Sequence, residues 1–208
     1  MRKHGVFFIL KCKAHLTYIF LYAILQLRNV KRALPKRTGG KMLNKRTRQY
    51  IGLFSAIIAY YIIHEGAHLL YALSIGVFKQ INFIGLGVQI DVYRELMTDT
   101  QLGIFCILGS IATAITAYLF IALISRIGKR QSKVFKACTY YITIALLILD
   151  PIYLSILCGF VGGGDMNGIV MIVPEGVARI VYGILLVVHV LLIFKVLIPK
   201  YKVAFEED

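Results

Sequence analysis

The chain has 208 residues, of which 59% are apolar and 16% charged, and its mean hydropathy is +0.76. About a quarter of the residues in a soluble domain are charged, so this chain has too little charge to cover a water-facing surface. Its apolar content excludes disorder over most of its length, and four cysteines are too few for a disulfide-rich secreted scaffold. These numbers predict an integral membrane protein with one compact bundle.

The charge is unevenly distributed. The formal charge is +14, and 13 of the 24 Lys and Arg residues precede Tyr50, in a stretch without any acidic residue. A basic segment beside a membrane span is typical of the cytoplasmic side and of contact with anionic lipids. No fold signature for nucleic acid accompanies it. We therefore expect the lipid bilayer, and not nucleic acid, as the partner of the basic residues.

The first 49 residues form a basic N-terminal segment with two open interpretations. Its apolar stretch 5–27 is interrupted by Lys11, Lys13 and His15, so an interfacial helix competes with a true membrane span. The codons of Gly39-Gly40-Lys41-Met42 could form a bacterial ribosome-binding site followed by a start codon. Either translation begins at Met42, or residues 1–41 form an ordinary extra helix and linker.

Four apolar stretches are long enough to cross a bilayer core of about 30 Å. They cover residues 51–77, 102–127, 134–160 and 176–198, within a core of residues 50–200 followed by a short tail, 201–208. The second is rich in small residues, which let helix backbones approach closely in lipid. The third contains Asp150-Pro151, a usual helix-break signal. Alternate connections are basic, which predicts a multi-pass protein of the cell membrane with both ends of the core in the cytoplasm.

The connection after the first span has strand character. Residues 78–91 are mostly β-branched and apolar, and Gly85 and Gly87 fall where a turn would lie. We expect a short β-hairpin at the membrane edge, where such backbone is tolerated if protein or a wet cavity covers it. The predicted fold is thus an all-α polytopic membrane protein with four core transmembrane helices, an N-terminal membrane or interfacial helix, and this hairpin.

The first span carries the motif HExxH, as His64-Glu65-Gly66-Ala67-His68. Residues four apart lie on one face of a helix, so both imidazoles can reach one Zn²⁺, and the Glu between them can take a proton from a water at the metal. With 5 His and 5 Glu in the chain, about 0.003 chance matches are expected. Three ionisable residues inside a span also cost several kcal/mol unless something satisfies them. A metal site is favoured over a structural hydrogen-bond network.

A catalytic zinc needs a third protein ligand and an open position. Asp150 and Asp165 are the acidic candidates near membrane depth, and His189 is more typical of a packed or hydrogen-bonded core histidine. Asp150 precedes a proline, so helix capping explains it, whereas Asp165 stands among four glycines that allow close backbone approach. We favour Asp165 and keep Asp150 as the alternative.

These features together resemble the site-2 protease family of intramembrane zinc metalloproteases. The resemblance covers roughly residues 50–175: the HExxH within a span, a short β element after it, and a span rich in small residues. The segment 108–113 is similar to the family's Gly-Pro-x-x-Asn, with Ser110 for Pro and Thr113 for Asn. The segment 164–168 resembles its Asp-Gly ligand region. No PDZ-like insertion is visible, so the chain is similar to a minimal, core-only member.

The resemblance implies hydrolysis of peptide bonds in or near the transmembrane helices of membrane-protein substrates. It implies zinc bound by His64, His68 and Asp165, with Glu65 as general base. The hairpin would pair with an unwound substrate strand by β-augmentation. Thr113 and Asn167 would be polar contacts to the substrate, although hydrogen bonding between helices explains either residue more simply.

Two other functions compete with proteolysis. A non-proteolytic membrane zinc protein would bind metal without needing Glu65 as a base. A metal transporter would need several acidic or His sites along its route, and beyond Asp165 the spans supply only His189 and Asp150.

Overall fold

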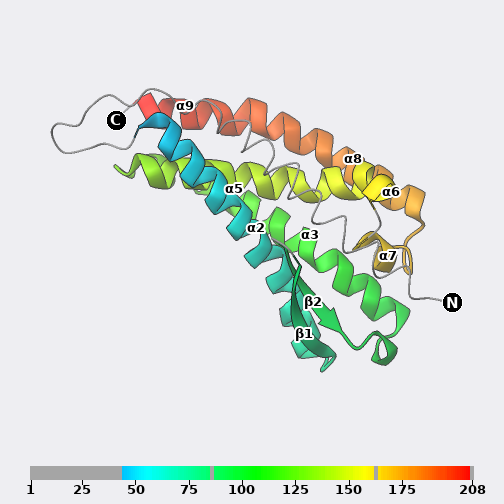
Figure 1. Cartoon of the computed structure of the whole chain (residues 1–208). Coiled ribbons are helices and arrows are strands. Elements are labelled where there is room, and N and C mark those ends of the chain that lie inside the picture. Colours follow the sequence, from blue (N-terminus) through cyan, green and yellow to red (C-terminus); the bar gives the residue numbers. More distant parts are fainter. Residues whose placement is uncertain (1–43, 85–86, 162–163, 207–208) are drawn as a thin grey trace.

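The structure is a computed structural model that describes residues 44–84, 87–161 and 164–206 (Figure 1). The N-terminal stretch 5–27 and the start at Met42 lie outside the described residues. The elements, in chain order, are α2 (Lys45–Ser74), β1 (Phe78–Ile84), β2 (Gly87–Val92), η2 (Arg94–Leu96), α3 (Asp99–Ala122), α4 (Ile124–Gly128), α5 (Lys133–Ile152), η3 (Tyr153–Leu157), α6 (Cys158–Val161), α7 (Met166–Ile169), α8 (Glu175–Leu192), η4 (Ile193–Leu197) and α9 (Ile198–Glu206).

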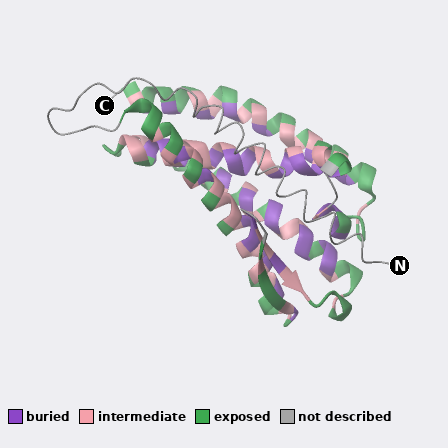
Figure 2. Ribbon diagram, in the orientation of Figure 1, coloured by how far each residue is buried: buried purple, intermediate pink, exposed green. Residues whose placement is uncertain are grey.

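The four predicted spans are confirmed as helical segments long and apolar enough to cross a membrane. They are Lys45–Ser74, Asp99–Ala122, Lys133–Phe160 and Glu175–Glu206. The third lies at the centre, with half of its most apolar window buried, and large apolar side chains remain exposed on the outside of the bundle (Figure 2). Such an outer surface suits contact with lipid. Residues 201–206, expected in a short tail, instead continue the last helix, and the side chain of Tyr201 is buried.

Helix α2 has one face of small and functional residues. Ala56, His64, His68 and Ala72 recur at multiples of four positions and are buried, whereas Phe54 on another face is 65% exposed. Successive residues of this series lie about one turn apart and form a buried stripe along the helix, and α2 packs against α3 and α5. The same periodicity that lets the helices pack therefore carries both histidines into the interior.

The expected hairpin is present. β1 and β2 pair antiparallel with Phe83 opposite Val88 and Ile84 opposite Gly87, so the strands are joined by residues 85–86, which lie outside the described residues. β2 packs on α2. Lys79 and Asp91 form an ion pair of 3.1 Å across the bulged end of the ladder, and their hydrogen bond raises the pKa of the Lys79 ammonium.

The basic segments gather at one end of the bundle. Lys45 at the start of α2, Lys133 at the start of α5 and Lys202 in α9 line one surface cavity, and Figure 1 shows the hairpin at the other end. This distribution is the one that the positive-inside rule requires. The cytoplasmic orientation of that end stays a prediction.

The expected break at Asp150-Pro151 does not occur. Pro151 lies inside α5, and the helix continues through the π-helical turn η3. Proline has no N–H, so the carbonyl of Leu147, four residues earlier, loses its helical donor. The ring of His189 on α8 supplies a replacement, because its Nδ1 donates to that carbonyl over 2.6 Å. A neighbouring helix thus supplies the donor that the proline removes, as helices within membranes are known to do.

His189 is therefore a hydrogen-bonded core histidine, as the sequence suggests. Its Nε2 accepts from the hydroxyl of Tyr118 on α3 over 2.7 Å, which fixes the proton on Nδ1. The side chain is 1% exposed and ties α8 to both α3 and α5.

The hydrogen bond from His189 to the Leu147 carbonyl predicts that substitutions of His189 and Pro151 have coupled effects on stability. His189→Leu should lower the free energy of unfolding by about 1–2 kcal/mol, since a buried carbonyl loses its donor. Pro151→Ala restores a backbone N–H for the same carbonyl, so the His189→Leu cost should shrink in that background. Thermal unfolding in detergent measures both. As a control, Tyr118→Phe removes only the other hydrogen bond of His189, and Pro151→Ala should not relieve its cost. Equal costs of His189→Leu in the two backgrounds would contradict the assignment.

Candidate metal centre

Two histidines from α2 face each other in the interior. His64 and His68 are 1% and 2% exposed, and their Nε2 atoms lie 3.2 Å apart. The rings are steeply inclined, with centroids 4.8 Å apart. One helical turn between the residues produces this arrangement, as expected for HExxH.

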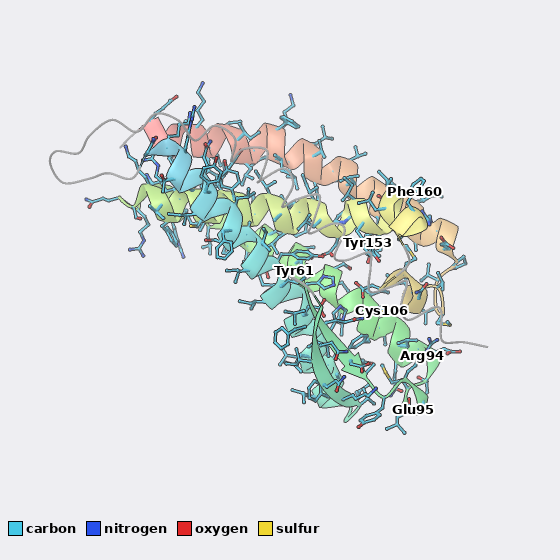
Figure 3. The ribbon with its side chains drawn as sticks, in the orientation of Figure 1. Tyr61, Arg94, Glu95, Cys106, Tyr153 and Phe160 are labelled. Atoms are coloured by element: carbon cyan, nitrogen blue, oxygen red, sulfur yellow. The ribbon has the colours of Figure 1, made fainter. Side chains whose placement is uncertain are left out.

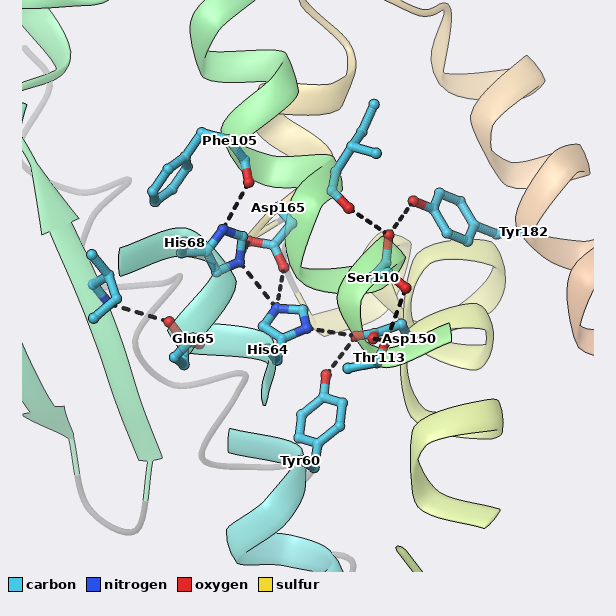
Figure 4. A network of polar contacts seen from close by, with 12 residues as sticks. Tyr60, His64, Glu65, His68, Phe105, Ser110, Thr113, Asp150, Asp165 and Tyr182 are labelled. Carbon is cyan, nitrogen blue, oxygen red and sulfur yellow. Dashed lines mark hydrogen bonds and ion pairs between the residues drawn. The ribbon is translucent and has the colours of Figure 1, made fainter. Parts of the chain in front are cut away.

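The third member of the cluster is Asp165, just before α7. Its Oδ2 lies 3.1 Å from Nε2 of His64, and its Oδ1 lies 3.7 Å from Nε2 of His68 (Figure 4). The ligand atoms of all three residues lie within 4.8 Å of one another, and all three side chains are buried. The structure thus brings together a buried His/His/Asp group that could hold a metal ion.

Glycines bring Asp165 to this position. A Cβ on Gly164 would lie 2.6 Å from the hydroxyl of Tyr153, and a Cβ on Gly168 would lie 3.0 Å from the carbonyl of Leu102 and closer still to Cys106. Figure 3 shows Cys106 on α3 and Tyr153 beyond the end of α5. Both approaches exclude a side chain, so the glycines let the segment dock against two helices. This close approach is what the Gly-rich sequence predicts.

The hydrogen-bond partners fix the protons of the two imidazoles. Nδ1 of His68 lies 2.7 Å from the carbonyl of Phe105, which can only accept, so this nitrogen carries the proton. Nδ1 of His64 lies 3.1 Å from a carboxylate oxygen of Asp150, as an ion pair without the alignment of a hydrogen bond, and the carboxylate likewise favours a proton there. Both Nε2 atoms therefore direct lone pairs at each other and at Asp165. Only a cation among them, a proton or a metal ion, relieves this repulsion.

Gly109 on α3 forms the wall of the cluster. A Cβ at this position would lie 2.7 Å from Nε2 of both His64 and His68. The absence of a side chain lets the backbone of α3 approach the ligand atoms closely. Two imidazoles and one carboxylate fit a transition-metal ion with N and O ligands.

Glu65 lies next to the His/His/Asp cluster, and its carboxylate bonds to the hairpin. Its Oε2 accepts a hydrogen bond of 3.2 Å from the backbone N–H of Ile90 on β2, and the side chain is 4% exposed. The carboxylate is therefore held by the hairpin, beside the ligands and outside the His/His/Asp group.

The remaining sequence candidates lie elsewhere. Asp150 contacts the opposite side of the His64 ring. Thr113 donates a hydrogen bond of 2.5 Å to Asp150 and so links α3 to α5, which is the interhelical role. Asn167 on α7 is exposed and lies outside the buried cluster.

Sequence reasoning missed the roles of Tyr60, of the Phe105 carbonyl and of Gly109, which it noted only within the segment 108–113. Tyr60 donates to Asp150 over 2.5 Å and stacks on His64 with ring centroids 5.2 Å apart. Its place four residues before His64 on the same helix face could have indicated it. A backbone carbonyl carries no sequence signal, and one glycine among several in a span rich in small residues does not stand out.

Comparison of the chain with protein-family models, with curated proteins and with solved structures finds no match.

The close approach of Gly109 to both histidines predicts that a substitution there removes the metal without changing any ligand residue. Gly109→Ala should abolish stoichiometric metal binding, because its Cβ would overlap both Nε2 atoms. The measurement is metal content of purified protein by elemental analysis. Gly66→Ala is the matched control: it lies within the HExxH itself, and its Cβ would meet nothing within 4 Å. Full metal content in the Gly109→Ala variant would show that the ion, if any, binds elsewhere.

Proposed function

We propose that this protein is an intramembrane zinc metalloprotease of the cell membrane, which hydrolyses peptide bonds in or near the transmembrane helices of other membrane proteins. One observation carries the proposal: two imidazole lone pairs and a carboxylate converge inside a bundle of apolar helices, and a second carboxylate lies beside them. Ionisable groups at membrane depth are retained for function by default.

The donor set favours zinc. His64, His68 and Asp165 supply two nitrogens and one oxygen, and a site of three protein ligands leaves a position open. When bound, zinc would polarise the scissile carbonyl and make water a better nucleophile. The resemblance of the HExxH and of the Gly-rich Asp165 segment to site-2 proteases supports the same assignment.

The chain's own residues would do the acid–base work. Glu65 adjoins a ligand in sequence and lies on the same helix, so its carboxylate would take a proton from the attacking water and pass it to the leaving amine. The N–H of Ile90 holds one oxygen of this carboxylate over 3.2 Å. A metal-binding protein without hydrolysis would have no need of such a base.

The outer edge of β2 would bind the substrate as an extended strand. The N–H of Ile90 points to Glu65 and not to β1, so Ile90 is at a position whose backbone groups face away from the ladder. Hydrogen-bonded and non-hydrogen-bonded residue pairs alternate along an antiparallel ladder. The backbone N–H of Val88, two residues before Ile90, therefore also points away from β1. An unwound substrate strand added to this edge would lie beside Glu65 and the metal ligands.

Glu65→Gln tests the catalytic role. The variant should keep its metal and its fold, and cleavage of a single-span membrane substrate should fall by about 10²–10⁴-fold, the usual contribution of a general acid–base group. The measurement is product formation with reconstituted protein. Glu175→Gln, which changes an exposed acid on α8, should leave cleavage unchanged. Undiminished cleavage by Glu65→Gln would make a non-proteolytic zinc protein the better interpretation.

Paired proline variants test the substrate edge. Val88 and Phe83 face each other across the ladder, and their N–H groups point to opposite edges. Val88→Pro removes an N–H from the edge beside Glu65 and should lower cleavage at least tenfold while metal content stays unchanged. Phe83→Pro removes the equivalent N–H from the far edge and should preserve cleavage. Equal activities of the two variants would exclude strand addition on β2.

A further inference from the structure

A second carboxylate, Asp150, lies behind the ligand His64. Its Oδ1 is 3.1 Å from Nδ1 of His64, while Nε2 of the same ring faces Asp165 at 3.1 Å. The ring thus lies between two carboxylates, one on each nitrogen (Figure 4). Asp150 is 1% exposed and is not among the residues whose ligand atoms converge.

Two hydroxyls hold the Asp150 carboxylate in place. Tyr60 of α2 donates to Oδ1 and Thr113 of α3 donates to Oδ2, each over 2.5 Å. Charge-assisted bonds of this kind are strong, and each carboxylate oxygen has its own donor. The carboxylate is therefore held toward Nδ1, because turning toward the Nε2 side would break both bonds.

We propose that Asp150 is a positioning residue for the metal: it keeps the proton of His64 on Nδ1 and thereby directs the Nε2 lone pair to the ion. The inference rests on the metal site of the proposed function. A carboxylate behind a ligating imidazole fixes the tautomer and raises the basicity of the ligand. The carbonyl of Phe105 fixes the tautomer of His68 in the same way.

Asp150→Ala and Asp150→Asn separate this role from simple packing. Zn²⁺ affinity of the full chain in detergent, measured by competition with a chelator, should fall 10–100-fold in the Ala variant, as for other partners of metal-bound histidines. Asn should restore thermal stability toward wild type, since it can still bond both hydroxyls. It should not restore affinity, because an amide can donate to Nδ1 and so stabilise the tautomer with the proton on Nε2.

Three further variants control the experiment. Thr113→Val removes one donor to Asp150 and should weaken Zn²⁺ binding severalfold, with no added effect in the Asp150→Asn background. If Asp150→Ala does not fold, this variant and Asp150→Asn carry the test. Tyr118→Phe removes the hydrogen bond between α3 and His189, away from the site, and should keep wild-type affinity. Asp165→Ala should lose Zn²⁺ binding almost completely.

The outcomes are distinguishable. Wild-type affinity in Asp150→Asn would overturn the inference, since the charge and the tautomer would then not matter. Loss of binding in Asp150→Ala with tight binding in Asp165→Ala would also overturn it, and would make Asp150 the third ligand. If the wild-type chain binds no Zn²⁺, the proposed function itself fails. If zinc is bound equally by wild type and all Asp150 variants, only this inference fails.

Discussion

The repulsion among three electron-rich atoms inside an apolar bundle constrains everything else in this structure. The Nε2 atoms of His64 and His68 and the carboxylate of Asp165 meet where apolar helices pack, and none of the three directs a proton at the others when both rings are neutral. All three side chains are buried. A cation is the remedy that the local chemistry supplies, and the surrounding polar contacts then make sense as devices that keep the lone pairs aimed inward.

Polar groups inside the bundle occur in connected sets, each of which compensates a specific cost. The proline after Asp150 removes a backbone donor, and His189 replaces it at the Leu147 carbonyl. The bond between Ser110 and Tyr182, 2.6 Å long, joins α3 to α8 one turn from Thr113. In lipid an unsatisfied polar group is expensive, so these residues come as donor and acceptor pairs on different helices. The same pairs fix the relative rotation of the helices, and a metal site assembled from three segments needs that precision.

The sequence predicts much of this arrangement because two of its signals are local. Apolar length marks each span, and the i, i+4 spacing of HExxH places two imidazoles on one face whatever the fold around them. The role of Asp150 could not be predicted in this way, since it depends on which side of the His64 ring α5 passes. Pro151 predicts a break from local chemistry, and only a histidine 38 positions later, on another helix, shows why the helix continues.

The hairpin links Glu65 to the strand edge at which we propose that the substrate binds. Glu65 accepts its hydrogen bond from Ile90, so the residue that we propose as the base is oriented by strand β2. A substrate helix has its carbonyls engaged in its own hydrogen bonds and must unwind before any of them can be attacked. Under the proposed function, the edge of β2 would offer those exposed backbone groups new partners beside Glu65, so the cost of unwinding would be partly recovered at the proposed site of cleavage. Recognition of backbone rather than side chains would then select substrates by how readily a segment unwinds, and helices with glycine or proline near the membrane centre unwind most readily.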